Sequence, residues 1–119
     1  MANFLFIYRG GGDDYATMTP QEIEENMKQW TDWITEGLQK GWMLDAGDAL
    51  TMEGRMVNSQ KVVTDGPFVE AKEVIGGYAI FELPGKQEAV AMAVEFMQLH
   101  KDFMPGWEGT CELRAFAGS

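Results

Sequence analysis

The sequence has few of the residue types that build redox, metal and disulfide-stabilised sites. It contains one cysteine and one histidine in 119 residues. One cysteine excludes an internal disulfide, as is typical of proteins in a reducing cytoplasm. One histidine and one cysteine also argue against a tetrahedral zinc site. We therefore expect a cytoplasmic protein that binds neither metal nor cofactor.

Positive charge and long apolar runs are also scarce. Nine basic residues stand against 19 acidic ones, which gives a net charge of −10. Nucleic acids and anionic membranes attract proteins mainly through Lys and Arg, so neither is an expected partner. No apolar run approaches the ~18 residues that span a bilayer, and the apolar start lacks the basic region of a signal peptide.

The length and the composition indicate a single globular domain over residues 1–119. Its first predicted strand, residues 4–8, is apolar on both faces, because Phe4, Phe6 and Tyr8 alternate with Leu5 and Ile7. A strand with one solvated face would alternate apolar and polar residues instead. One face can take the helices of the same chain, and the other needs a second cover.

A helix is predicted from residue 20 onward. Thr19 fits the N-cap, Pro20 the first helical position, and Glu22 completes a capping box. Gly41 fits the residue that ends the helix. The apolar stripe expected to face the core consists of Ile23, Met27, Trp30, Ile34 and Leu38.

The remaining elements complete an α+β pattern. They are strands at 42–52, 74–83 and 110–116, a small hairpin at 55–64, and a helix at 86–99. Without the hairpin the order is βαββαβ, which predicts a ferredoxin-like fold: a four-stranded antiparallel sheet with both helices on one face. Because an apolar sheet face is unusual on a soluble monomer, we expect a homodimer that forms through the open face.

The most distinctive run is residues 63–78, VTDGPFVEAKEVIGGY. It resembles the signature of the DGPF-domain family, part of the YCII-related group: a DGPF tetrapeptide, an acid, a Lys-Glu pair and a Gly-Gly-aromatic strand. The likeness extends to the strand that ends in Tyr8, the helix start at 20–22, and the strand at 111–114. It therefore spans nearly the whole chain.

The resemblance implies a bacterial protein with a ferredoxin-like fold, assembled as a dimeric α+β barrel. Relatives in the broader group look like enzymes that use a His–Asp pair, with the histidine on the first helix. The first helix predicted here contains no histidine, so that pair is not transferred. Some family members occur beside extracytoplasmic-function sigma factors, which implies a possible regulatory partner.

The loop after the hairpin holds four candidate site residues. Asp65 suits a turn residue that bonds its own backbone, and it also suits a general base or a hydrogen-bond acceptor at a cleft. Glu70, Lys72 and Glu73 form either a solvated charged surface or a ligand-binding cluster on a loop positioned by the sheet.

Four further candidates lie on strands and on the second helix. Tyr8 and Tyr78 either pack in the core or line a shared pocket. His100 either interacts with the end of its helix or titrates in a site. Arg114 either holds an anionic ligand or pairs with an acid across the sheet.

These residues leave two functions open. One is a cofactor-independent enzyme or small-molecule binder, with a pocket between the sheet and the helices. The other is a non-enzymatic interaction module, which could act with a sigma factor. An enclosed cavity where such residues converge favours the first, and a filled core with outward charges favours the second.

Overall fold

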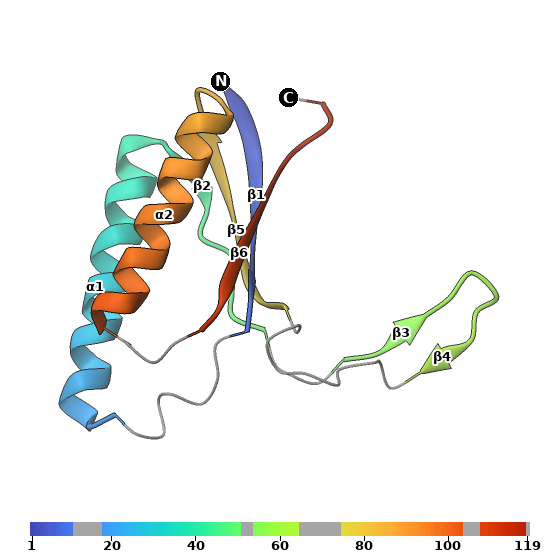
Figure 1. Cartoon of the computed structure of the whole chain (residues 1–119), viewed down its shortest axis with the longest axis horizontal. Helices are drawn as coiled ribbons and strands as arrows, with labels where there is room; N and C mark the ends of the chain where they lie inside the picture. The colour runs from blue at the N-terminus through green and yellow to red at the C-terminus, as the bar shows by residue number, and fades with distance from the viewer. Residues whose placement is uncertain (11–17, 51–53, 65–74, 104–107, 119) are drawn as a thin grey trace.

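The computed structural model describes residues 1–10, 18–50, 54–64, 75–103 and 108–118. This part of the chain forms two helices and two antiparallel sheets (Figure 1). In chain order the elements are β1 (Ala2–Arg9), α1 (Pro20–Lys40), β2 (Met43–Asp45), β3 (Met56–Val57), β4 (Val63–Thr64), β5 (Ile75–Leu83), α2 (Lys86–Phe103) and β6 (Thr110–Ala115). No described helix is long and apolar enough to cross a membrane.

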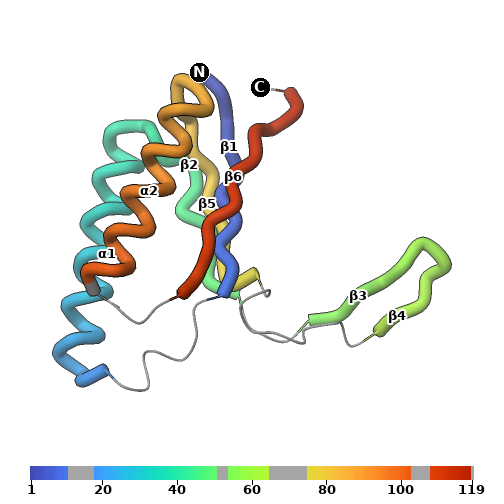
Figure 2. The backbone as a smooth tube through the Cα atoms, in the orientation of Figure 1, coloured from blue at the N-terminus to red at the C-terminus, as the bar shows by residue number. Residues whose placement is uncertain are grey.

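The main sheet has the strand order β2-β5-β1-β6, and all of its pairs are antiparallel. Without the β3–β4 hairpin, this is the order of the split βαβ unit. The predicted ferredoxin-like fold class is therefore confirmed. Both helices lie on one side of the sheet, and the hairpin extends on the other side (Figures 1 and 2).

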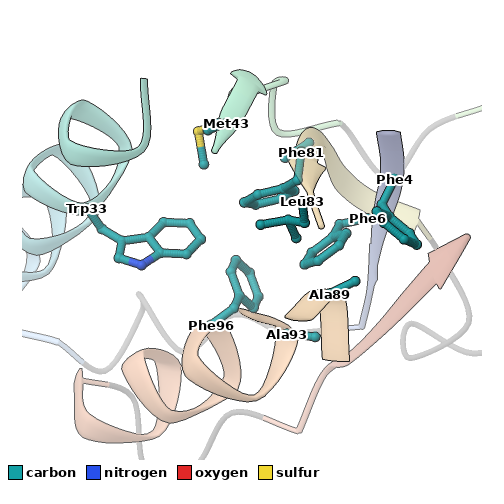
Figure 3. Close-up of a cluster of buried hydrophobic side chains, with 10 residues drawn as sticks. Phe4, Phe6, Trp33, Met43, Phe81, Leu83, Ala89, Ala93 and Phe96 are labelled. Carbon is teal, nitrogen blue, oxygen red and sulfur yellow. The ribbon is translucent and has the colours of Figure 1, made fainter. Parts of the chain in front are cut away.

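The core lies between the main sheet and the two helices (Figure 3). Residues alternate along a strand, so Phe4 and Phe6 of β1 point to the helices, where they are buried. Leu5 and Ile7 therefore point to the opposite face, where they are only half-buried. The buried hydrophobic set is Phe4, Phe6, Trp33, Met43, Ala79, Phe81, Leu83, Ala89, Ala93 and Phe96.

Helix α1 begins and ends as its sequence predicts. The Thr19 hydroxyl accepts a hydrogen bond from the Glu22 amide at 3.1 Å, and the Glu22 carboxylate accepts one from the Thr19 amide at 3.0 Å. Gly41 closes the helix in the left-handed conformation, with φ 83°. The capping box therefore fixes where the helix starts.

The buried face of α1 differs from the predicted stripe. Met27 and Leu38 are 56% and 49% exposed, whereas Asn26 and Gly37 are buried. A Cβ on Gly37 would lie 2.7 Å from the Trp42 ring, so this ring occupies the space that a side chain would take. A stripe drawn from hydrophobic residues alone leaves out glycine and asparagine. The predicted core face of α1 is therefore rotated about the helix axis relative to the face that is buried.

Two strands of the main sheet, β2 and β5, have irregular backbone at glycines. Of the strand expected at 42–52, the structure describes residues 42–50, and in these the strand is regular over Met43–Asp45, with one further bridge from Ala49 to Gly77. Gly47 interrupts it because its φ is +65°, outside the extended range. A bulge lies at Gly76 in β5, since Tyr8 pairs with Gly77 and Arg9 with Ile75.

The sheet face opposite the helices holds mixed side chains. By alternation it carries Leu5, Ile7 and Ile80, which are half-buried. Arg9 of β1 and Glu112 of β6 form an ion pair there, with 3.0 Å between Nη2 and Oε1. The first strand thus places Leu5 and Ile7 on a second face as predicted, but charged side chains of the neighbouring strands lie among them.

Candidate functional site

A pocket of about 560 Å³ opens between the two helices and the sheet. Its walls come from both helices, the ends of β1 and β5, and the segment that follows β2. The lining residues are Tyr8, Gly10, Met27, Trp30, Ile34, Ala46, Gly47, Asp48, Ala49, Gly76, Gly77, Tyr78, Phe96 and His100. This volume lies within the range of small-molecule sites.

Aromatic rings form one wall of the pocket. Tyr8 stacks on Phe96, with 4.1 Å between ring centroids and an interplanar angle of 3°. The Trp30 ring lies 5.2 Å from Phe96 and 4.5 Å from His100. Phe96 and His100 are four residues apart, so they share one face of α2 and their rings lie 4.6 Å apart. Phe96 therefore links β1, α1 and the histidine.

Glycines form the opposite wall. The Leu50 amide donates to the Gly76 carbonyl at 2.8 Å, which draws the segment after β2 against β5. Gly47 packs directly on Tyr78, since a Cβ there would lie 1.8 Å from the Tyr78 carbonyl oxygen. The Asp45 carboxylate accepts a hydrogen bond from the Gly47 amide at 2.8 Å and holds this turn. The wall depends on close backbone approach rather than on side chains.

Tyr8 and His100 are both uncharged at neutral pH. Burial raises the pKa of Tyr8 well above its ordinary value, and the neighbouring Cys111 adds to the effect. Burial lowers the pKa of His100 to about 4, against a smaller opposing effect of the Phe96 carbonyl. That carbonyl lies 3.4 Å from Nδ1, which favours the tautomer with its proton on Nδ1. Burial also raises the pKa of Cys111 to about 12, so its thiol stays protonated.

Acid should destabilise the fold through His100. The folded-state pKa of about 4 lies below the ordinary 6.5, so the unfolded chain takes up the proton first as the pH falls. The stability that depends on neutral His100 is complete above pH 6.5 and is lost between 6.5 and 4. Because solvent screens the partly exposed ring, we expect a loss of about 1–2 kcal/mol. Urea unfolding at the two ends of this range measures it.

The control for this prediction is His100→Gln. Carboxylates that titrate in the same range affect both proteins equally, so the difference between the proteins isolates the histidine. Wild type should lose more stability on acidification than the variant does. Equal losses would contradict a folded-state pKa of about 4 for His100.

The pocket has little charge. Among the described lining residues, Asp48 is the one side chain charged at neutral pH, and it is exposed at the rim. Within the described ranges, no group of three or more His, Cys, Asp or Glu residues gathers where it could hold a metal ion. The described walls therefore suit an apolar or aromatic molecule that is neutral or carries positive charge near Asp48.

The pocket gathers part of the predicted site. Tyr8, Tyr78 and His100 are all among its lining residues, although they come from two strands and a helix. Tyr78 pairs with Ile7 and alternates with buried residues of β5, so its side chain belongs to the sheet face opposite the helices. Arg114 is exposed and alternates with Leu113, which packs on the core, so it faces away from the helices and the pocket. The four loop candidates, Asp65, Glu70, Lys72 and Glu73, lie outside the described residues.

Several lining residues were not predicted as site residues. Trp30 was expected only on the core-facing stripe of its helix, and neither Phe96 nor Asp48 was named as a site residue. The clearest signal for the glycine wall is Gly47, because a glycine inside a predicted strand suggests a close approach. Asp48 gives no such signal, since its place at the rim follows from the turn at Gly47.

The fold and the pocket define the class of protein: a ferredoxin-like α+β domain with a cavity between its helices and its sheet. A family model for the YCII-related domain matches residues 12–96, which is more than half of the chain. The chain belongs to the YCII-related family, and its DGPF motif is consistent with this membership. No curated protein matches the sequence.

Proposed function

We propose that the protein binds a small apolar or aromatic molecule in this pocket without a cofactor, and that it does so as a homodimer. The observation that carries the proposal is the pocket of about 560 Å³ with a wall of stacked aromatic rings. In a filled core, Trp30, Ile34 and Phe96 would close over one another. Here they line an opening together with Gly47, Gly76 and Gly77 of the glycine wall.

The polar contacts to the ligand are proposed to come from two places. His100 offers a neutral imidazole, and Tyr8 offers a phenol that keeps its proton. Asp65, as acceptor or base, and the charged residues Glu70, Lys72 and Glu73 are proposed to add further polar contacts. Support comes from Gly76, the second residue of β5, which lines the pocket and follows these residues closely in the sequence.

The homodimer is proposed to form through the sheet face opposite the helices. Leu5, Ile7 and Ile80 supply its half-buried apolar surface. When two such faces pair, each copy covers the apolar surface of the other, which the helices of one chain cannot reach. Arg114, on the same face, is proposed to contact the second copy or a ligand held there.

The binding proposal is tested with N-phenyl-1-naphthylamine, a neutral aromatic probe whose fluorescence rises in apolar sites. Wild type should bind it saturably. Met27→Ser should weaken binding about threefold to tenfold, because Met27 lines the pocket and its thioether chain would no longer cover the probe. Fluorescence titration gives both dissociation constants.

Leu38→Ser is the matched control for this experiment. Leu38 lies on the same helix with a similar exposure, 49% against 56% for Met27, but it is not a lining residue. Its variant should bind the probe as wild type does. Probe binding that is absent, or equally weakened by both substitutions, would rule out this pocket as the site.

The second candidate function is the interaction module, which could include a sigma factor as partner. The observation that favours it is the exposed β3–β4 hairpin, which extends away from the helices (Figure 1). A protein that binds no ligand in the pocket but loses a macromolecular complex when the hairpin is altered would match this second function.

A further inference from the structure

The β3–β4 hairpin is a small sheet whose apolar side chains are uncovered. It consists of two residue pairs, Met56 with Thr64 and Val57 with Val63. The Asn58 carboxamide oxygen closes its turn by accepting hydrogen bonds from the amides of Gln60 and Val62. Met56, Val57, Val62 and Val63 are between 49% and 64% exposed.

Both faces of the hairpin are apolar. Val57 and Val63 are paired directly and so share one face. Met56 and Val62 lie on the other face by alternation. A two-stranded hairpin is marginally stable alone in water, and exposed valines on both faces leave it without a core. The hairpin therefore needs a surface outside itself to pack on.

The hairpin also differs in charge from the rest of the chain. Residues 54–64 contain Arg55 and Lys61 and no acidic residue, a local charge of +2. The remaining residues hold seven basic and 19 acidic side chains, since the whole chain has nine and 19; their net charge is −12. Two copies of this acidic body repel each other, whereas the hairpin of one copy is attracted to the body of another.

The direction of the hairpin brings it to that second body. Both helices lie on one side of the main sheet, and the hairpin extends on the opposite side (Figure 1). The radius of gyration, 15.8 Å, exceeds the about 13.5 Å expected for a compact chain of this length. A copy seated on the open sheet face would thus lie on the side toward which the hairpin extends.

From these observations we infer that the hairpin is an exchanged arm: each copy packs its β3–β4 hairpin against the acidic body of a second copy of this chain. The inference rests on the homodimer proposed above and deepens it. The apolar side chains of the arm bury on the partner, and Arg55 and Lys61 offset the repulsion between the two acidic bodies.

The test compares dimer dissociation constants by analytical ultracentrifugation over a dilution series. The variant Val57→Ser/Val63→Ser makes one face of the arm polar, and these exposed side chains add little to the fold of one copy. It should weaken the dimer by about tenfold or more. The matched control is Val90→Ser/Val94→Ser on α2, with exposures of 45% and 62%, which should leave the constant unchanged.

Charge reversal tests the electrostatic part independently. Lys61→Glu should raise the dimer dissociation constant at low salt. The ratio of the variant's dissociation constant to that of wild type should shrink in 1 M NaCl, where the screening length falls to about 3 Å. Comparing the ratio removes the effect of salt on repulsion between the bodies. A ratio that does not depend on salt would overturn the electrostatic role of the arm.

Failure of the arm and failure of the dimer give different results. Ile80→Thr alters the open sheet face but not the hairpin. If Ile80→Thr weakens the dimer while both hairpin variants leave it unchanged, the dimer stands and the exchanged arm is wrong. The hairpin would then serve a different partner. If wild type is monomeric throughout the dilution series, both the dimer and the arm are wrong.

Discussion

Replacing Phe96 with alanine is expected to lower the free energy of unfolding by about 3–5 kcal/mol. The Phe96 side chain is 5% exposed, and its ring contacts rings from β1, α1 and its own helix. Alanine would leave a cavity beside an existing pocket, and the stack on Tyr8 would be lost. Urea unfolding followed by circular dichroism measures the change.

The control for Phe96→Ala lies two residues earlier on the same helix. Val94 is 62% exposed, so Val94→Ala removes apolar atoms without opening a cavity. Its effect should stay within about 0.5 kcal/mol. If Phe96→Ala cost as little as the control does, the ring could not be the link between β1, α1 and α2 described above.

The second large effect is expected for Gly47→Ala. Its φ of +65° is strained for any residue with a Cβ, at a cost of about 1–2 kcal/mol. The new Cβ would also lie 1.8 Å from the Tyr78 carbonyl oxygen, so the turn or β5 must move. Displacing packed backbone adds about 1–3 kcal/mol, and we expect a total loss of about 2–5 kcal/mol. Probe binding in the pocket should weaken in the same variant.

Gly41→Ala separates these two causes. Gly41 has a similar φ of +83°, but a Cβ there would meet nothing within 4 Å. Its substitution therefore reports the backbone cost alone, about 1–2 kcal/mol. Chemical denaturation of both variants gives the difference. Equal losses at positions 41 and 47 would show that the turn at Gly47 yields freely, and the glycine wall of the pocket would not be rigid.

Elements with a local physical cause were predictable from the sequence. The start of α1 follows from Thr19, Pro20 and Glu22, which act within four residues of one another. The strand β1 follows from its alternating apolar residues, and the βαββαβ order then fixes the sheet topology. The buried face of α1 could not be predicted, because it depends on the Trp42 ring filling the space beside Gly37.

The candidate site was predictable in its residue types but not in its geometry. Tyr8 and Tyr78 stand out as polar-tipped aromatics on strands, and His100 as the only histidine. Their convergence depends on the bulge at Gly76 and on the turn at Gly47, which act between segments far apart in the chain. Arg114 looked equivalent in the sequence, but its strand alternation directs it, like the Tyr78 side chain, to the other face.

The pairing of β1 has a consequence for the order in which the protein matures. Leu5 pairs with Ile80 on one side and with Arg114 on the other, partners 75 and 109 positions later. Such separations slow folding, because long loops must close before these contacts form. During synthesis, α1 can become helical soon after it leaves the ribosome, while β1 waits with both of its edges unpaired. The apolar strand β1 therefore stays unpaired in the nascent chain until β5 and then β6 have been synthesised.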